Sequence, residues 1–352
     1  HCGEILMKAK VKSKLNLEGR VALQDVIPLS TPFLLYVDPS SACNFSCQFC
    51  PTGHRDLLKA SEYQRSVMKF ELFEKLIRDL EVFPEPLKVM RMNKIGEPLL
   101  NKKLPAMISL AKASGRVRYI DLATNAALFS PDLLTRLVAA GLDRMNVSLE
   151  GISQEQYAKH AKVEIDFEQL VENIRWLYAH RGDCEVTIKI PGNYLTADDK
   201  TRFFDLFGNH CDRIFVEELA PIWPEFDVEK RAGVDMQDRT GQYRQSLEEK
   251  DVCTYIFYAM AINADGTVSA CCPDWDQKLI VGDLNRESLR EIWNSPALHD
   301  LRLQHLRGAR RDNPLCKACG HIKYAQADNI DAYKPFLLEK VAGQYARMAE
   351  KE

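Results

Sequence analysis

The chain has 352 residues, of which 46% are hydrophobic, and its 47 Lys and Arg residues are balanced by 50 Asp and Glu residues, for a net charge of −3 at pH 7. This length suits one large domain with its own hydrophobic core and a second, smaller one. The balanced charge does not favour binding to nucleic acid or to an acidic membrane surface, and the longest unbroken apolar stretches, such as Phe33–Val37, are too short to span a bilayer.

The eleven cysteines indicate the kind of site to expect. Disulfide frameworks are typical of small secreted domains, and no charged segment followed by an apolar one opens the chain as in a secretory signal. The cysteines are also clustered, with three within residues 43–50 and five between Cys253 and Cys319. Clustering favours metal ligation over disulfides, and we expect a reducing, cytoplasmic location.

Residues 1–32 are interpreted as an N-terminal extension, after which residues 33–217 alternate short β-rich runs with longer amphipathic stretches. The predicted strands are Phe33–Asp38, Lys88–Asn93, Arg118–Thr124, Arg144–Leu149, Glu185–Ile190 and Arg213–Glu217. The predicted helices include Lys69–Val82, Lys102–Ala113, Pro131–Ala140, Phe167–Ala179 and Ala197–Phe207. Six successive strand–helix units predict an α/β fold with a parallel sheet, in which functional sites gather at the carboxyl ends of the strands.

The rest of the chain has a different pattern. Residues 218–252 contain prolines and a charged run, which predicts a linker. Residues 253–320 combine short strands around a turn with one helical stretch at Leu289–Leu306, which predicts a small second domain. Residues 321–352 end in an amphipathic stretch and predict a C-terminal packing helix.

Cys43, Cys47 and Cys50 follow the first predicted strand, which places them at the carboxyl edge of the sheet. A structural zinc site or a cubane iron–sulfur cluster takes four protein ligands, and this segment supplies three. A [4Fe–4S] cluster held here would therefore keep one iron open to chelate a small molecule. The alternative is a zinc knuckle completed by a distant ligand such as His54.

The cysteine spacing, with three residues before the second cysteine and two before the third, closely resembles the motif of the radical S-adenosylmethionine (SAM) enzymes. The resemblance implies that residues 33–217 form a parallel (β/α)6 partial barrel similar to a TIM barrel. It also implies that SAM binds the open iron through its amino and carboxylate groups. Reductive cleavage then yields methionine and a 5′-deoxyadenosyl radical, which abstracts a hydrogen atom from the substrate.

The resemblance extends to positions near the strand ends. It implies that Phe49 packs near the adenine of SAM and that Gly96 and Glu97 hold its amino group, with Ile95 in place of another glycine of the family. The remaining candidate contacts to SAM or substrate are Thr124, Asn125, Ser148, Glu150, Lys189 and Glu217. From the residues alone, Asn125 suits a turn or a helix cap equally well, and a strand-end charge can simply be solvated.

A second cysteine set comprises Cys253, Cys271, and Cys316 with Cys319 in Cys-x-x-Cys spacing. Four thiolates suit a closed zinc or iron–sulfur site. The segment is similar to the auxiliary-cluster domains of radical SAM enzymes, SPASM and its shortened form twitch, and most similar to the twitch dehydrogenases of aminocyclitol biosynthesis. This implies one auxiliary [4Fe–4S] cluster with four protein ligands and no open iron.

Cys272 is adjacent to one of these proposed ligands. On an extended segment its side chain would point away from that of Cys271. It is either a hydrogen-atom donor for an epimerase or a packed free cysteine, and we favour the second interpretation.

The resemblance therefore predicts a radical SAM oxidoreductase that oxidises an alcohol carbon of a sugar or aminocyclitol. The auxiliary cluster would accept the second electron, and a reductant of flavodoxin or ferredoxin type would supply the first. The alternatives are peptide modification, epimerisation of a sugar or peptide, and a zinc-stabilised binding module. Peptide modification ranks lower because the roughly 32 residues before the first strand are few for a separate leader-peptide-binding domain.

Overall fold

The computed structural model describes residues 7–13, 15, 19–61, 63–236 and 240–349. Within these residues ten strands form one sheet in the order β1-β7-β6-β5-β4-β3-β2-β8-β9-β10. The strands are β1 (Lys10–Val11), β2 (Leu34–Val37), β3 (Leu87–Arg91), β4 (Val117–Thr124), β5 (Arg144–Ser148), β6 (Glu185–Pro191), β7 (Arg213–Glu217), β8 (Ala259–Ile262), β9 (Thr267–Ser269) and β10 (Ile280–Asp283).

The helices are α1 (Leu23–Val26), α2 (Arg55–Ala60), α3 (Phe70–Asp79), α4 (Leu104–Ala113), α5 (Pro131–Ala139), α6 (Gln154–His160), α7 (Phe167–His180), α8 (Ala197–Phe207), α9 (Val228–Ala232), α10 (Tyr255–Tyr258), α11 (Leu289–Trp293), α12 (Pro296–Leu306), α13 (Pro314–Ala318), α14 (His321–Tyr324) and α15 (Lys334–Ala349). In the described part of the chain, no helix has both the length and the apolar character needed to cross a membrane.

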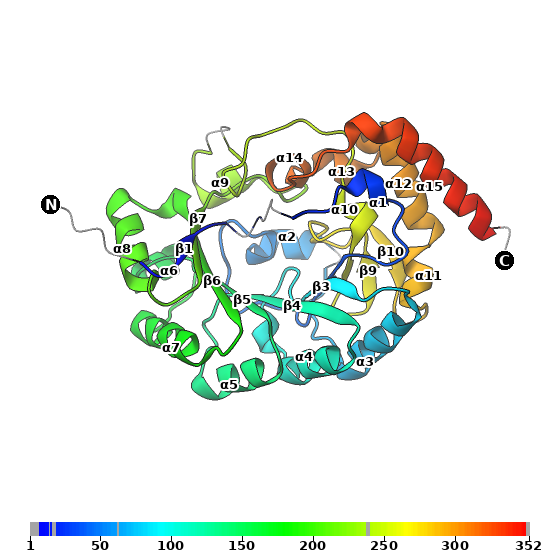
Figure 1. Ribbon diagram of the computed structural model, residues 1–352. Coiled ribbons are helices and arrows are strands. Elements are labelled where there is room, and N and C mark those ends of the chain that lie inside the picture. Colours follow the sequence, from blue (N-terminus) through cyan, green and yellow to red (C-terminus); the bar gives the residue numbers. More distant parts are fainter. Residues whose placement is uncertain (1–6, 14, 16–18, 62, 237–239, 350–352) are drawn as a thin grey trace.

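The six strands predicted from the sequence are all present, and β2 to β7 pair in parallel in chain order. They curve into a partial barrel with α3, α4, α5, α7 and α8 along its outer side (Figure 1). The predicted helix starts are confirmed: Ser130 caps α5 by accepting from the Leu133 N–H, and Thr196 forms a capping box with Asp199 on α8. The predicted α/β partial barrel is therefore confirmed.

The C-terminal segment extends this sheet. Strand β8 lies parallel to β2, and β9 and β10 follow it in antiparallel order. The helical stretch expected at Leu289–Leu306 is present as two helices, because α11 ends at Trp293 and α12 begins at Pro296. Ser295 caps α12 by accepting from the Leu298 N–H, and proline at the first helical position cannot continue the hydrogen-bonding ladder of α11.

Successive side chains of a barrel strand point to opposite faces of the sheet, and this separates an apolar outer face from a polar inner one. On β2, Leu35 and Val37 join the main hydrophobic core, whereas Tyr36 points to the opposite face. There the guanidinium of Arg91 binds both carboxylate oxygens of Asp121, at 2.9 and 2.7 Å, and donates to the Tyr36 hydroxyl at 3.2 Å. On this face the charges of Arg91 and Asp121 therefore neutralise each other.

Candidate functional site

A cavity of about 190 Å³ lies at the carboxyl ends of the barrel strands. It is lined by all twelve residues expected to hold the first cluster or to contact SAM or substrate: Cys43, Cys47, Cys50, Phe49, Gly96, Glu97, Thr124, Asn125, Ser148, Glu150, Lys189 and Glu217. The strands place these side chains together because the carboxyl ends of parallel strands meet at one edge of the sheet. Their individual roles remain predictions.

The three cysteines lie on the irregular segment between β2 and the short 3-10 helix Pro51–Gly53. The Cys50 N–H donates to the Cys47 carbonyl at 3.2 Å, which folds the loop tightly. Burial raises the pKa of the Cys43 thiol to about 12 and that of Cys47 well above its usual value. Thiols this strongly desolvated ionise readily only when a metal compensates the charge.

His54 does not complete a four-ligand set with these thiols. Its Nε2 lies 2.8 Å from the Gln48 carbonyl, and its ring packs against Phe226 with centroids 5.4 Å apart. The structure therefore does not support the zinc knuckle with His54 that the sequence left open.

Glu97 is held in place by three hydrogen bonds. Its Oε1 accepts from the Thr124 hydroxyl at 2.7 Å and the Leu99 N–H at 3.0 Å, and its Oε2 accepts from the Asn125 N–H at 2.9 Å. Burial raises the pKa of Glu97 to about 7, because desolvation outweighs these bonds to the ionised form. Glu97 thus lies at the cavity wall as an oriented carboxylate, suited to bind a cationic group.

Asn125 makes the turn contact that the sequence left open, and its contact with SAM or substrate stays a prediction. Its Oδ1 accepts from the Ala127 N–H at 3.0 Å, which is a turn contact. Its Nδ2 donates to Asn44 Oδ1 at 2.8 Å and lies 4.0 Å from Cys43 Sγ. Asn125 therefore links the end of β4 to the cysteine loop.

The far wall of the cavity carries one ion pair and a further carboxylate, Glu150, that forms no ion pair among the described residues. Lys189 forms an ion pair with Glu217 across β6 and β7. Glu150 Oε2 and Glu217 Oε2 are buried and have no hydrogen-bond partner among the described residues. Burial raises the pKa of Glu150 to about 8. Buried polar atoms without partners are expensive, so these oxygens fit a polar or cationic ligand in the cavity.

Gly96 allows the cysteine loop to approach the end of β3. A Cβ on Gly96 would overlap the Ser40 carbonyl and lie 2.6 Å from the Ala42 carbonyl. The backbone of this turn also binds the loop, since the Glu97 N–H donates to the Ala42 carbonyl at 2.8 Å. A glycine is required here by close approach rather than by an unusual φ.

We expect Gly96→Ala to displace the cysteine loop and to lower the affinity for SAM at least tenfold, which is about 1.4 kcal/mol. Equilibrium dialysis with SAM on the anaerobically reconstituted protein measures this. Gly233→Ala is the matched control, because a Cβ there meets no atom within 4 Å although its φ is +65°. Equal SAM affinity in wild type and Gly96→Ala would show that the loop does not depend on this contact.

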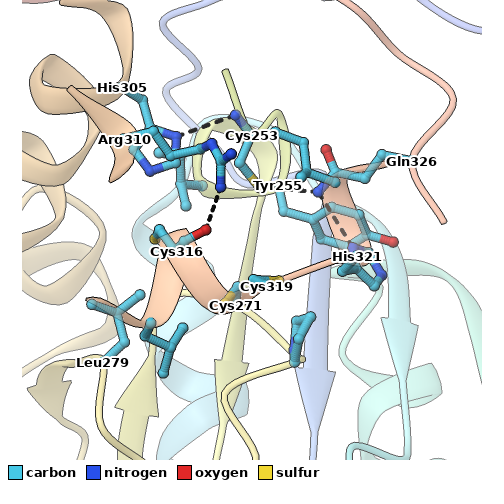
Figure 2. A pocket seen from close by; sticks show the side chains of 14 residues that line it. Cys253, Tyr255, Cys271, Leu279, His305, Arg310, Cys316, Cys319, His321 and Gln326 are labelled. Carbon is cyan, nitrogen blue, oxygen red and sulfur yellow. Dashed lines mark hydrogen bonds between the residues drawn. The ribbon is translucent and has the colours of Figure 1, made fainter. Parts of the chain in front are cut away.

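The second cysteine set surrounds another cavity, lined by Cys253, Cys271, Cys316 and Cys319 (Figure 2). Cys316 lies on α13, and Cys319 follows the end of that helix. Burial raises the pKa of Cys316 and Cys319 to about 12. Among the described residues, no three His, Cys, Asp or Glu side chains are close enough to hold a single metal ion. The thiolates of a cubane cluster bind four different irons and need not converge on one point.

Two observations show that the second cavity suits an anionic group. Arg310 is 7% exposed, and its guanidinium donates to the Cys316 carbonyl. The described residues include no ion pair between Arg310 and a carboxylate. A buried cation is costly unless an anion compensates it, and a cluster with four thiolates is anionic. Arg310 is therefore not a solvated arginine at a helix end.

Cys272 and Cys271 point to different surroundings. Cys271 lines the second cavity, whereas the charge of the Cys272 thiol acts on Tyr36, Tyr243 and Tyr255. Tyr36 and Tyr255 meet on the inner face of the barrel, with their hydroxyls 3.4 Å apart. Cys272 does not line the second cavity, although its charge also acts on Cys319 there.

Sequence reasoning missed two buried residues that join distant segments of the chain near these sites. Lys94 follows β3 and donates to Asn263, Ser269 and Asp274 of the C-terminal segment. Gln326, beyond the cysteine pair, donates to Cys253 Sγ at 3.0 Å. No local pattern identifies either residue, because both depend on contacts between distant segments.

Comparison with known proteins agrees with this geometry. Residues 37–204 match the radical SAM superfamily, and residues 253–320 match the SPASM iron–sulfur cluster-binding domain. The tungsten-containing aldehyde ferredoxin oxidoreductase cofactor-modifying protein of Pyrococcus furiosus is 24% identical over 333 residues, covering 84% of this chain and 90% of that protein. Other curated relatives match over 189 residues, which is 57% of their length.

Two solved structures share the fold. BtrN in complex with AdoMet and 2-DOIA has a TM-score of 0.53 and 16% identity, covering 85% of this chain and 97% of that chain. SuiB of Streptococcus suis bound to the precursor peptide SuiA has a TM-score of 0.58 and 14% identity, covering 86% of this chain and 72% of that chain. At these identities the likeness concerns the fold alone.

Proposed function

We propose that this chain, a member of the radical SAM superfamily with a C-terminal iron–sulfur cluster-binding domain, oxidises an alcohol carbon of a small polar metabolite such as a sugar or an aminocyclitol. The observation that carries the proposal is the presence of two separate thiol sets, one of three and one of four. Three thiols leave an iron open for SAM, whereas four close the second site to ligands and suit it to electron transfer.

The residues assigned to each group follow from the two cavities. Cys43, Cys47 and Cys50 would hold the first [4Fe–4S] cluster, and Cys253, Cys271, Cys316 and Cys319 would hold the auxiliary one. When bound, SAM and the two clusters supply a 5′-deoxyadenosyl radical for hydrogen abstraction and an acceptor for the electron that remains.

The chain itself binds and orients SAM and the substrate. Glu97 offers an oriented carboxylate to the amino group of SAM, and the unpartnered oxygen of Glu150 faces the same buried cavity. On the inner face, Arg91 with Asp121 and Lys189 with Glu217 present donors and acceptors without a net charge. Such a lining suits hydroxyl and amino groups of a polyol and disfavours a strongly charged substrate.

Radical epimerisation or peptide modification is the second candidate. The charge of the Cys272 thiol acts on Tyr36 and Tyr255, and a thiol that reaches the substrate from there could return a hydrogen atom to a substrate radical. The fold shared with SuiB, solved with its precursor peptide, makes a peptide a reasonable substrate to test.

The test is product analysis with C-deuterated inositols, hexoses and aminocyclitols, SAM and dithionite, followed by replacement of dithionite with a flavodoxin or ferredoxin. We expect one polyol to give a ketone and deuterated 5′-deoxyadenosine in equal amounts. Cys271→Ala should still release 5′-deoxyadenosine but lower ketone formation at least tenfold. Cys272→Ala is the control and should retain ketone formation.

Two outcomes would contradict this proposal. An inverted alcohol or amino-acid centre in place of a ketone, with turnover lost in Cys272→Ala, would identify an epimerase. Deuterium transfer only from added peptides would identify a peptide-modifying enzyme.

A further inference from the structure

Gln326 lies beside the auxiliary-cluster cavity but outside the region that matches the cluster-binding domain, in the segment between α14 and α15. Its side chain is 4% exposed. Its amide nitrogen lies 3.0 Å from Cys253 Sγ and 3.3 Å from His321 Nδ1 (Figure 2). An amide that donates to a ligand sulfur is placed to act on the electronic properties of a cluster.

The orientation of this amide follows from its other contacts. Gln326 Oε1 accepts from the Thr254 backbone N–H at 3.2 Å and from the Thr254 hydroxyl at 3.1 Å. Because a backbone N–H only donates, the oxygen must face Thr254 and the NH2 group must face the sulfur. Lys250 Nζ donates to the Gln326 carbonyl at 2.6 Å and holds the backbone there. The donor to Cys253 is therefore fixed in direction.

Arg310 adds a positive charge to the same cavity. It lies in the 3-10 turn Arg310–Asp312 that precedes α13, and its Nε has no hydrogen-bond partner among the described residues. Arg310 lines this cavity together with Cys253, Cys316 and Cys319, and its guanidinium donates to the Cys316 carbonyl. A negative charge is also near, because the Asp274 carboxylate acts on Cys271 and Cys316, but this carboxylate accepts from the Lys278 and Leu279 N–H groups.

The two thiol sets thus differ in electrostatic surroundings. The cavity of the SAM site is lined by the three carboxylates of Glu97, Glu150 and Glu217 and by the two cations Lys94 and Lys189. At the second site the cation Arg310 and the amide of Gln326 face the thiols. A cluster gains one negative charge on reduction, so positive charge and N–H···S bonds stabilise its reduced form.

On the basis of the proposed function, we propose that Gln326, together with Arg310, raises the reduction potential of the auxiliary cluster and thereby suits it to accept an electron. Gln326 acts through Cys253 and is a positioning residue rather than a catalytic one. The reaction concerned is the one-electron reduction of the auxiliary cluster, with no bond made or broken in Gln326.

The test uses the full chain with Cys43, Cys47 and Cys50 replaced by alanine, so that only the auxiliary cluster contributes. Its midpoint potential is measured by EPR-monitored titration with dithionite. Gln326→Glu keeps the acceptor for Thr254 but removes the donor to sulfur, and Gln326→Met removes both without adding charge. Each variant should lower the equilibrium constant for one-electron reduction of the auxiliary cluster at least tenfold, which lowers its midpoint potential by about 59 mV or more. Thr254→Val is the matched control. It should change the equilibrium constant for reduction of the cluster less than about threefold, because the backbone N–H of residue 254 still orients the Gln326 amide.

The outcomes separate this inference from the proposed function. An unchanged potential in both loaded Gln326 variants would overturn the inference and leave the proposed function intact. Loss of the cluster in both Gln326 variants but not in Thr254→Val would also overturn the inference. Gln326 would then be needed to assemble the auxiliary cluster rather than to set its reduction potential. Absence of a cluster from the parent chain would refute the proposed function itself.

Discussion

Replacing Cys43, Cys47 and Cys50 together by alanine should lower the iron content of the reconstituted protein from about eight to about four per chain. SAM cleavage should fall to background, because the open iron that chelates SAM is lost. The four thiols around the second cavity lie on other segments, so the remaining iron should be unaffected. Iron and labile sulfide assays after anaerobic reconstitution, with detection of 5′-deoxyadenosine, measure both effects.

A Cys184→Ala/Cys211→Ala variant is the matched control for this experiment. Both thiols are buried in the hydrophobic core and line neither cavity. This variant should keep about eight irons and SAM cleavage. About four irons in wild type and none in the triple variant, with zinc at the other cysteines, would remove the electron acceptor and with it the dehydrogenase proposal.

Lys94→Met should lower the free energy of unfolding by about 3–5 kcal/mol, since it removes one partner from a buried charged network. Lys94 Nζ donates to Asn263 Oδ1 at 2.5 Å, Ser269 Oγ at 3.2 Å and the Asp274 carbonyl at 2.8 Å. It thereby ties the end of β3 to the segment that carries Cys271. The variant would leave three acceptors without their donor, and urea denaturation measures the loss.

The decrease in the free energy of unfolding caused by Lys94→Met should depend on pH, because Lys94 acts on the buried carboxyl group of Asp38. Burial raises the pKa of Asp38 to about 6 in the folded protein, although Lys94 acts in the opposite direction. A folded pKa above the unfolded value means that the ionised carboxylate destabilises the fold. Without Lys94 this cost increases, so the deficit of the variant should be larger at pH 8 and decrease as the pH falls toward 5.

Lys88→Met is the control for this effect. Lys88 lies on β3 with its ammonium 3.4 Å from the ring centroid of Phe33, so its loss removes a cation–π contact but no buried hydrogen-bond network. A cost of about 1 kcal/mol or less is expected for it. Two results would contradict the role assigned to Lys94. One is an equal decrease in the free energy of unfolding for both variants, and the other is a decrease for Lys94→Met that does not change with pH.

Much of the barrel could be predicted from local sequence. Each strand from β2 to β7 is a short β-rich run bounded by turn residues, and helices such as α8 begin at capping residues that are legible in the sequence, Thr196 and Asp199. Two features were not predictable in this way. Strand β1, two residues long, exists only through its pairing with β7, and α11 and α12 are separate because Ser295 and Pro296 start a new helix.

The candidate site also has features that could be predicted from local sequence and features that could not. The residues expected at the SAM site all line one cavity, because each lies at or just after a strand end and parallel strands bring their ends together. The burial of Arg310 was not predictable, since an arginine near a helix end is ordinarily solvated. Its position depends on how the 3-10 turn packs against the second cavity.

The sequence by itself determined the class of chemistry, through the spacing of Cys43, Cys47 and Cys50 and the four later cysteines, and the α/β partial barrel, through its periodicity. Cysteine spacing and hydrophobic periodicity involve residues close together in the chain, so they can be read from the sequence directly. Only the tertiary structure decided that Lys94 joins the two sites and that Gln326 donates to Cys253. These contacts join residues 180 and 73 positions apart, and the packing of the whole chain sets them.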